Sequence, residues 1–384
     1  MNTKHSTPVV LNQLADDSHL AKPLPTPTGT YPYRLNIRDV LGYKSTLLEQ
    51  QMCFHMVGDT GSVRHSAFQS RIAAALARQA GEHQTMTENP TFLYHLGDVV
   101  YNHGEASEYP KQFFAPYEHY PAPIFAIAGN HDGDINPDSA LVYQSLDTFM
   151  DVFCDTYQRK VMFAGGSKRL SMTQPNVYWS LQTPLAYFIG LYGNVTKHGT
   201  IYQDQFEWFV EELKNADQYR PDLAIIVCLH HAPYSADTNH GSSLPMIAFL
   251  DRAFDAAGVK PDIVFSGHVH NYQRFSKLYE DGSTIPFVVA GAGGYADLHR
   301  IAGVEDPGVS TLDSGRHGVR LENFCDDRFG FLKITIERQD DQLLLIGEYY
   351  TMSMPLHNRM PDRHEAVLFE RFSVPLRNSA YAVY

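Results

Sequence analysis

The sequence has little that would support a disulfide-stabilised, membrane-spanning or nucleic-acid-binding protein. Its four cysteines, Cys53, Cys154, Cys228 and Cys325, are far apart and form neither a CxxC pair nor a disulfide framework. No apolar run approaches the roughly 18 residues of a membrane span. Lys and Arg number 30 against 43 Asp and Glu, for a formal net charge of −13. Because a surface for duplex nucleic acid normally needs a basic stripe, we expect neither a nucleic-acid nor a membrane partner.

The first residues, "MNTKHSTPVVLNQLADDSHL", also lack the basic start, continuous apolar segment and cleavage site of a signal peptide. We therefore expect a cytoplasmic protein. The glycine-rich stretch "AGAGGYAD" has neither a Walker lysine nor the GxGxxG spacing, so we expect a tight structural turn there and no phosphate loop. No feature of the sequence indicates an oligomeric state.

What the chain does contain is ample material for a folded core, with 43% hydrophobic and 12% aromatic residues among 384. Prolines in "KPLPTPTGTYP" predict an extended N-terminal arm over residues 1–45. Apolar strand-like runs then alternate with amphipathic segments, which predicts an α/β fold. We expect one domain over 46–384, with an insertion at 133–190 and a C-terminal extension after 350.

Individual elements can be predicted from periodicity and turn residues. Helices are expected at 66–81, 204–216 and 244–258, where apolar residues recur every three or four positions. A hairpin is expected in "NVYWSLQTPLAYFIGLY" (176–192), and two antiparallel strands in 330–350 around a polar turn at 339–342. These stripes predict packing surfaces.

Five strand-like runs end on polar side chains. The runs are "CFHMVGDTG", "FLYHLGDVVY", "PIFAIAGNHD", "LAIIVCLHHAPY" and "DIVFSGHVH". They present seven candidate ligands: Asp59, Asp98, Tyr101, Asn130, His230, His268 and His270. In four of the five runs a glycine directly precedes the first polar residue, and glycine permits the sharp turn that points a side chain off a buried strand. Since ligands of α/β sheets bind at the carboxyl ends of strands, we expect these ends to converge.

The donor types point to metal ions. Oxygen and nitrogen ligands suit hard or borderline metals. Seven donors exceed the need of one tetrahedral ion, so they favour two metals that share a bridging carboxylate.

In this order, the blocks GDTG, GDVVY, GNHD, VCLHH and GHVH resemble those of the calcineurin-like metallophosphoesterases, over about residues 52 to 350. More narrowly, they resemble the purple acid phosphatases. Most of the superfamily has Asp-x-His in the first block, whereas this chain has Asp59-Thr60-Gly61 and carries Tyr101 in the second block. The stretch before Asp59 is too short for the extra β domain of the plant-type enzymes, so the resemblance is to the short form. It implies two mixed β-sheets packed in a sandwich and flanked by helices, a four-layer αββα fold.

The resemblance also implies how the metals are held. The first metal, iron(III), would be bound by Asp59, Asp98, Tyr101 and His270. The second, iron, zinc or manganese, would be bound by Asp98, Asn130, His230 and His268. A phenol has a pKa of about 10, so binding as phenolate near neutral pH demands a strong Lewis acid such as ferric iron. The summed metal charge exceeds that of the three anionic ligands and would attract a phosphate dianion.

The sequence leaves one metal ligand undecided between two neighbouring histidines. Counting V-x-x-H from Val227 selects His230, whereas an H-x-P pattern selects His231. We prefer His230, because the alternation of side chains along the preceding strand must be respected.

Three further residues are expected to take part in catalysis. The hypothesis is that a metal-bound hydroxide attacks the phosphorus of a small phosphomonoester in line, and that His131 protonates the leaving oxygen. Asp132 would hold either the His131 imidazole or its loop in place. His240, in the polar loop "YSADTNHGSS", is a candidate substrate contact.

Two alternatives remain beside this interpretation. One is a phosphodiesterase or nucleotide-processing hydrolase on the same scaffold, because the metal ligands do not separate monoesters from diesters. The other is a binding module that has lost catalysis. Such a module should have lost ligands or His131, and none is lost here.

Overall fold

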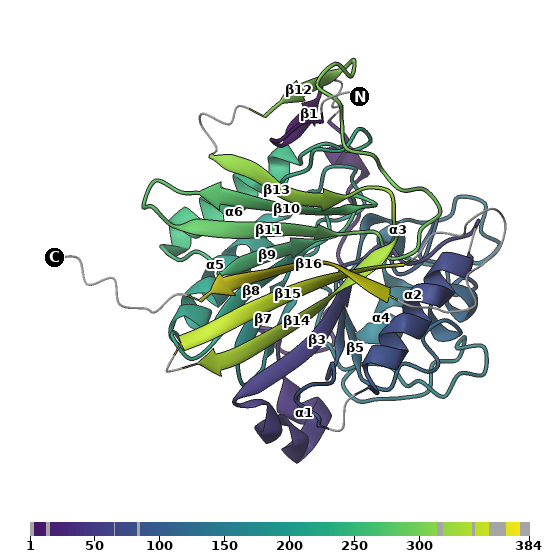
Figure 1. The fold of residues 1–384 in the computed structure, drawn as a ribbon. Helices are drawn as coiled ribbons and strands as arrows, with labels where there is room; N and C mark the ends of the chain where they lie inside the picture. The colour runs from purple at the N-terminus through teal and green to yellow at the C-terminus, as the bar shows by residue number, and fades with distance from the viewer. Residues whose placement is uncertain are drawn as a thin grey trace.

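The computed structural model describes residues 4–12, 16–64, 66–82, 85–312, 318–339, 342–352 and 366–376. Its two large mixed sheets pack against each other, with helices on the outside, which confirms the predicted α/β sandwich (Figure 1). Among the described residues, no helix is long and apolar enough to cross a membrane. The four cysteines are buried and free, as their spacing predicted.

The first sheet has six strands. In spatial order they are β16 (Ala366–Pro375), β15 (Gln342–Met352), β14 (Gly330–Gln339), β3 (Gln51–Val57), β4 (Leu93–His95) and β5 (Ile124–Ala126). Strands β3, β4 and β5 are parallel, so their carboxyl ends share one edge. The antiparallel pair β14–β15 confirms the strands predicted in 330–350, although residues 340 and 341 of the turn lie outside the described residues.

The second sheet has eight strands. In spatial order they are β13 (Val319–Cys325), β10 (Tyr272–Leu278), β11 (Thr284–Ala290), β9 (Ile263–Ser266), β8 (Ala224–Leu229), β7 (Ala186–Gly190), β6 (Trp179–Gln182) and β2 (Arg34–Asn36). Strands β7, β8, β9 and β11 are parallel. The predicted hairpin is confirmed as β6–β7. Because β7 also pairs with β8, the end of the expected insertion is part of this sheet.

The three helices that periodicity predicted are present as α2 (Ser66–Gln79), α5 (Gln203–Asp217) and α6 (Leu244–Ala257). Not predicted were α1 (Ile37–Leu41), α3 (Asn130–Gly133) and α4 (Asp147–Phe153), and the short helical turns η1 (Ser18–Leu20), η2 (Gly42–Leu48) and η3 (Pro110–Phe114). The two ends of helix α6 show why its bounds could be predicted from the sequence. The Ser243 side chain accepts a hydrogen bond from the Met246 amide at its start, and Gly258 adopts a left-handed φ of 66° at its end.

An aromatic cluster joins the two sheets. Phe54 of β3 packs on Phe188 of β7 with ring centroids 5.2 Å apart, and Phe92 contacts both rings. Burial of such side chains contributes about 1.5–3 kcal/mol each. This contact holds the carboxyl ends of β3–β5 next to those of β8 and β9, which places the five motif-bearing strand ends together.

The N-terminal segment is tied to the body by two short strands. Residues 22–30 form no helix, as their prolines predicted, whereas α1 and the start of η2 are helical within the arm that was predicted to be extended over 1–45. Strand β2 extends the eight-stranded sheet beside β6. Strand β1 (Val9–Leu11) pairs with β12 (Val309–Thr311) in a separate two-stranded sheet. Of the region after 350, residues 353–365 and 377–384 lie outside the described part, and β16 borders the six-stranded sheet.

Candidate metal centre

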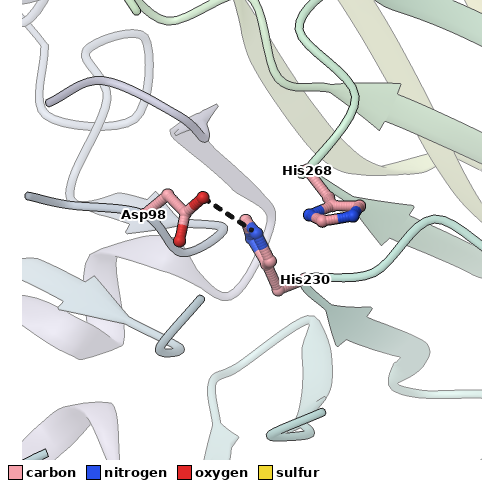
Figure 2. A group of neighbouring side chains, drawn as sticks. All are labelled: Asp98, His230 and His268. Carbon is pink, nitrogen blue, oxygen red and sulfur yellow. Dashed lines mark ion pairs between the residues drawn. The ribbon is translucent and has the colours of Figure 1, made fainter. Parts of the chain in front are cut away.

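The candidate site lies where the strand ends of both sheets meet. Asp98 follows β4 of the six-stranded sheet, whereas His230 and His268 follow β8 and β9 of the eight-stranded sheet. Figure 2 shows the three side chains facing one another, and their ligand atoms all lie within 4.8 Å of each other. All three residues are buried. The convergence predicted from the sequence is therefore present for these residues.

Three candidate ligands have an unusual backbone conformation. Asp59, Asp98 and His268 have φ values of 58°, 54° and 68°, in the left-handed region. For a residue other than glycine this conformation costs of order 1 kcal/mol and persists only where the surrounding structure imposes it. Each of these residues turns the chain directly after a buried strand, so the strained backbone aims the side chain across the strand ends.

Glycines let neighbouring backbone segments pack closely against the carboxylates of Asp59 and Asp98. A Cβ atom on Gly129 would lie 2.1 Å from Oδ1 of Asp98. A Cβ atom on Gly267 or Gly291 would lie 2.6 or 2.7 Å from Oδ2 of Asp59. Gly291 begins the glycine-rich stretch after β11, so close packing on Asp59 explains a glycine there without any phosphate loop.

Asp59, Tyr101 and His270 form a second group of donors. The Tyr101 hydroxyl donates to Oδ1 of Asp59 over 3.1 Å and lies 3.3 Å from Nε2 of His270. That nitrogen is 3.6 Å from Oδ1 of Asp59. Burial raises the pKa of both Asp59 and Tyr101 well above their usual values when no cation is bound. A cation would be needed to keep such a buried phenol ionised.

Hydrogen bonds to backbone carbonyls fix which ring nitrogen of each histidine is free. The Nδ1–H of His230 donates to the Leu96 carbonyl over 2.8 Å, and the Nδ1–H of His270 donates to the Asp297 carbonyl over 3.0 Å. In His268 it is Nε2–H that donates, to the Lys197 carbonyl over 3.0 Å. The free nitrogens are therefore Nε2 of His230 and His270 and Nδ1 of His268. Metal-binding histidines are usually oriented in this way.

Asn130 completes the set of predicted ligands. It begins α3, and its Oδ1 is buried without a hydrogen-bond partner among the described residues. An unpaired buried amide oxygen costs about 1–3 kcal/mol, which a cation would remove. Nε2 of His230 lies 3.2 Å from Oδ2 of Asp98. Although burial lowers it, the pKa of His230 is raised to about 9 by the Asp98 carboxylate when no cation is bound, so a proton lies between the two groups where a cation would bind. The donor types, the free nitrogens and this unpaired oxygen all fit metal ions.

The structure separates His230 from His231. Nε2 of His231 donates to the Thr196 carbonyl over 2.6 Å, and its Nδ1, which has no partner among the described residues, does not belong to the group of ligand atoms around Asp98. Burial lowers the pKa of His231 to about 3. His230, by contrast, lies beside Asp98, which agrees with the preference derived from strand alternation.

Asp132 and His131 have different surroundings. The buried Asp132 carboxylate accepts hydrogen bonds from the amides of Val99 and Gly129 over 3.0 and 2.8 Å, and so joins the loops after β4 and β5. The His131 ring donates through Nδ1–H to the Asn102 carbonyl over 2.7 Å. Of the two roles left open for Asp132, the contacts therefore favour holding the loop. The imidazole is held by Asn102.

A cavity of about 820 Å³ opens beside these ligands, and His131 and His240 both line it. The His240 ring lies 4.1 Å from the His268 ring, and its Nδ1 is buried without a partner among the described residues. Burial lowers the pKa of His240 to about 4. The structure thus brings His240 to the candidate centre, where a substrate could contact it.

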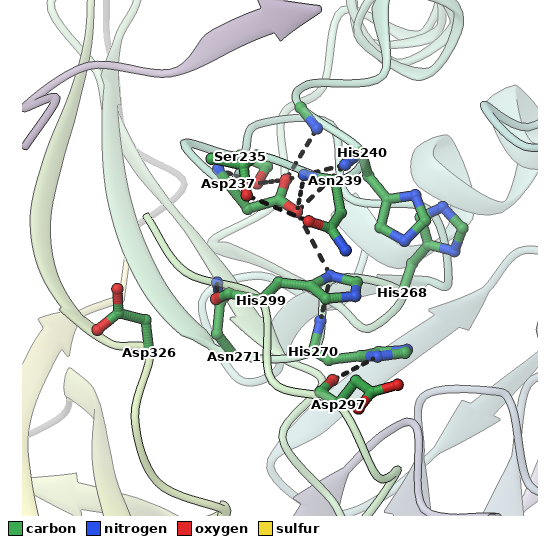
Figure 3. Close-up of polar contacts among 12 residues, drawn as sticks. Ser235, Asp237, Asn239, His240, His268, His270, Asn271, Asp297, His299 and Asp326 are labelled. Carbon is green, nitrogen blue, oxygen red and sulfur yellow. Dashed lines mark hydrogen bonds and ion pairs between the residues drawn. The ribbon is translucent and has the colours of Figure 1, made fainter. Parts of the chain in front are cut away.

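Asp237 organises the loop that carries His240. Its carboxylate accepts hydrogen bonds from the amides of Asn239, His240 and Gly241, over 2.9, 3.1 and 2.8 Å. Figure 3 shows Asn239 and His240 beside it. Nδ1 of His299 lies 3.4 Å from the same carboxylate. Asp237 is fully buried, so this hydrogen-bond network fixes the loop from the protein interior.

Sequence reasoning missed three residues that surround the ligands. The Gln112 side chain accepts from the Tyr101 amide over 2.9 Å and donates to the Tyr101 carbonyl over 2.6 Å. The rings of Tyr295 and His299 lie 4.5 and 4.2 Å from the His270 ring. Tyr295 and His299 follow β11, so extending the strand-end argument to this strand would have found them. Gln112 lies in η3 and has no such signal.

Comparison with known proteins identifies the class. The sequence model of the family "Calcineurin-like phosphoesterase" matches residues 54–272, more than half of the chain. The chain belongs to this family of phosphoesterases.

The relatives of known sequence include purple acid phosphatases, which confirms the narrower resemblance. Purple acid phosphatase 15 of Arabidopsis thaliana is 26% identical over 54% of this chain and 37% of its own length. Purple acid phosphatase 1 of Ipomoea batatas is 29% identical over 41% of this chain and 30% of its own. "Fe(3+)-Zn(2+) purple acid phosphatase 12" of Arabidopsis thaliana is 28% identical over the same shares. The matches thus span about a third of these relatives.

Among solved structures, GAP50, described as the anchor in the inner membrane complex of Plasmodium, has the same fold. The TM-score is 0.53 at 14% identity, over 86% of this chain and 90% of that one. At this identity the likeness concerns the fold alone.

Proposed function

We propose that this chain is a binuclear-metal phosphatase that hydrolyses small phosphomonoesters. The observation that carries the proposal is the meeting of two donor groups at the strand ends, one of Asp59, Tyr101 and His270 and one of Asp98, His230 and His268. Membership of the phosphoesterase family supports it.

For the first metal we propose iron(III), held by Asp59, Asp98, Tyr101 and His270. The argument is the phenol, because a buried tyrosine with a raised pKa becomes a ligand only beside a strong Lewis acid. For the second metal, held by Asp98, Asn130, His230 and His268, we propose iron, zinc or manganese. A relative whose name specifies Fe(3+) and Zn(2+) supports this choice.

When bound, the metals supply Lewis acidity that lowers the pKa of water and neutralises charge on phosphoryl oxygens. The chain's own residues supply proton transfer and orientation. His131 lines the cavity, and its hydrogen bond from Nδ1–H to Asn102 leaves Nε2 as the nitrogen that, in the imidazolium form, gives its proton to the leaving oxygen. His240 lines the same cavity and would contact the phosphate.

The test is metal analysis of protein purified without chelators, followed by kinetics on phenyl phosphate and on bis(phenyl) phosphate. We expect two metal equivalents per chain and a higher kcat/KM for the monoester. Dominant turnover of the diester would instead support the phosphodiesterase alternative. Two bound metals with no turnover of either ester would support a binding module.

Substitution of Tyr101 tests the assignment of iron. The oxidised, iron-loaded protein should have a visible tyrosinate charge-transfer band, and Tyr101→Phe should abolish it. The loss of one hydrogen bond to Asp59 should cost only about 1 kcal/mol of stability, so the variant should fold. A band that persists in Tyr101→Phe, or a colourless oxidised wild type with full iron content, would contradict the assignment.

A further inference from the structure

The cavity beside the candidate centre is larger than a phosphate group requires. Its volume is about 820 Å³. One water occupies about 30 Å³ in the liquid, so there is room for a sizeable leaving group beyond the phosphate. It is lined by candidate ligands such as Asp98 and His268, by residues of the loops at 195–197 and 238–240, and by Asp17 of the N-terminal segment.

Lys197 is the only lysine or arginine among the described residues that line this cavity. Its side chain is exposed and forms no ion pair with any carboxylate of the described residues. Two carboxylates of the same lining, Asp17 and Asp297, already have a hydrogen-bond or ion-pair partner. Asp17 accepts the Lys197 amide N–H over 2.5 Å, and Asp297 lies 3.2 Å from the Arg64 guanidinium. The Lys197 ammonium is therefore available to an anion in the cavity.

The backbone of Lys197 is held in place beside the candidate ligands. Its carbonyl accepts the Nε2–H of His268 over 3.0 Å. Upstream, the Asn194 side chain accepts from the Lys22 amide over 2.8 Å and donates to the Lys22 carbonyl over 2.9 Å. The backbone that brings Lys197 to the lining of the cavity is thus held in place.

We propose that Lys197 binds a second anionic group on the leaving group of the substrate. The preferred substrates are then phosphomonoesters that also carry a carboxylate or a further phosphate. This inference rests on the proposed phosphatase activity and deepens it, because it defines the substrate class. In a chain with a net charge of −13, Lys197 is the one lysine or arginine that the described lining of the cavity offers to such a group.

The experiment compares two substrates on metal-loaded protein. 2-Phosphoglycerate and glycerol 2-phosphate differ only in a carboxylate in place of a hydroxymethyl group. Wild type should prefer 2-phosphoglycerate in kcat/KM, and added salt should reduce the preference. In Lys197→Gln the ratio of the two kcat/KM values should fall about fivefold, the range for an exposed ion pair, mainly through KM. Lys197→Arg should keep most of the preference.

Lys44→Gln is the matched control, because Lys44 is an exposed lysine of η2 that does not line the cavity. It should leave the ratio unchanged. A wild type that hydrolyses both esters without a preference, or a Lys197→Gln protein that keeps it, would overturn the inference and leave the phosphatase proposal standing. Turnover of neither ester would count against the phosphatase proposal.

A binding measurement keeps the inference testable in that last case. Calorimetry on the metal-loaded protein would compare 3-phosphonopropionate with propylphosphonate, which lacks the carboxylate. We expect 3-phosphonopropionate to bind about fivefold more tightly to wild type and equally to Lys197→Gln. Equal affinities of the two compounds for wild type would contradict the role of Lys197.

Discussion

The two sheets contribute different chemistry to one site. The six-stranded sheet presents oxygen donors, whereas the eight-stranded sheet presents nitrogen donors. The oxygen donors are Asp59, Asp98, Tyr101 and Asn130, and the nitrogen donors are His230, His268 and His270. A centre of mixed ligands therefore forms only when the two sheets pack together, which is why no single sheet or local segment accounts for it.

The two sides are also positioned by different means. Short carboxylates reach the centre because the backbone itself turns there, with left-handed φ values at Asp59 and Asp98. The longer histidines are aimed by a hydrogen bond from one ring nitrogen to a carbonyl, as in His230 and His270. His268 has both a left-handed backbone conformation and a hydrogen bond from one ring nitrogen to a carbonyl. Substitutions on the oxygen side should therefore disturb charge most, and those on the nitrogen side should disturb orientation.

The largest effect is expected for Asp98→Asn, on the oxygen side. This residue is the proposed bridge, so its charge serves both metals. We expect loss of bound metal and a fall in kcat of about a thousandfold, or about 4 kcal/mol. Metal analysis and monoester kinetics check this, with Asp134→Asn as control, because the Asp134 carboxylate pairs with the half-buried His103 and is not one of the proposed ligands. Full metal content and activity in Asp98→Asn would refute the bridging role.

On the nitrogen side, neighbouring histidines provide a matched pair. His230→Asn keeps an amide near the position of Nδ1 but removes Nε2, the proposed ligand. His231→Gln keeps an amide near Nε2, which bonds to Thr196. We expect His230→Asn to lose about one metal equivalent and about a hundredfold in kcat, and His231→Gln to keep both metals. The reverse pattern would transfer the ligand role to His231.

A smaller effect is expected for Asp132, which holds together the loops that carry the oxygen donors. Asp132→Asn keeps the size of the side chain but weakens the acceptors for the Val99 and Gly129 amides. We expect the free energy of unfolding to fall by about 2 kcal/mol, the range for hydrogen bonds to a charged group, while both metals still bind. Denaturant unfolding measures the change. An unaltered midpoint would show that Asp132 does not hold these loops together.

The smallest effect concerns a histidine of the six-stranded sheet that is not a ligand. His55 is fully buried between Tyr120 and Gln79, and burial lowers its pKa to about 3. Below its ordinary value of about 6.5 the unfolded chain takes up a proton that the folded chain does not. Stability is therefore fully present above pH 6.5 and declines as pH falls toward 3.

Between pH 6.5 and pH 5.5 this histidine should contribute a loss of up to about 1.4 kcal/mol. Denaturant unfolding at several pH values should show a shallower dependence in His55→Gln than in wild type. If stability depended on pH equally in the two proteins, the buried His55 ring would have to take up a proton in the folded state as well. The contrast between the six-stranded and the eight-stranded sheet would then weaken.

Much of this molecule could be predicted from the sequence, because the signals are local. The helix at 244–257 is marked by Ser243 and Gly258, and the hairpin at 179–190 by alternation. The strand ends at Asp98 and His268 could be recognised because a glycine precedes each. Tyr295 and His299 follow β11 and could have been found by the same strand-end argument, whereas nothing local marks Gln112.

By itself, the sequence determined which side chains are offered and in what order, because strand periodicity and turn chemistry depend on neighbours along the chain. Only the tertiary structure decided how they are used. It brought Asp98 next to His230 and turned the His231 ring toward the Thr196 carbonyl. It also bonded the Asp132 carboxylate to backbone amides of the loops, and not to the His131 imidazole. It placed Lys197 in the lining of the cavity. The physical reason is that these contacts join distant segments, and their geometry arises only when the two sheets bury their shared core.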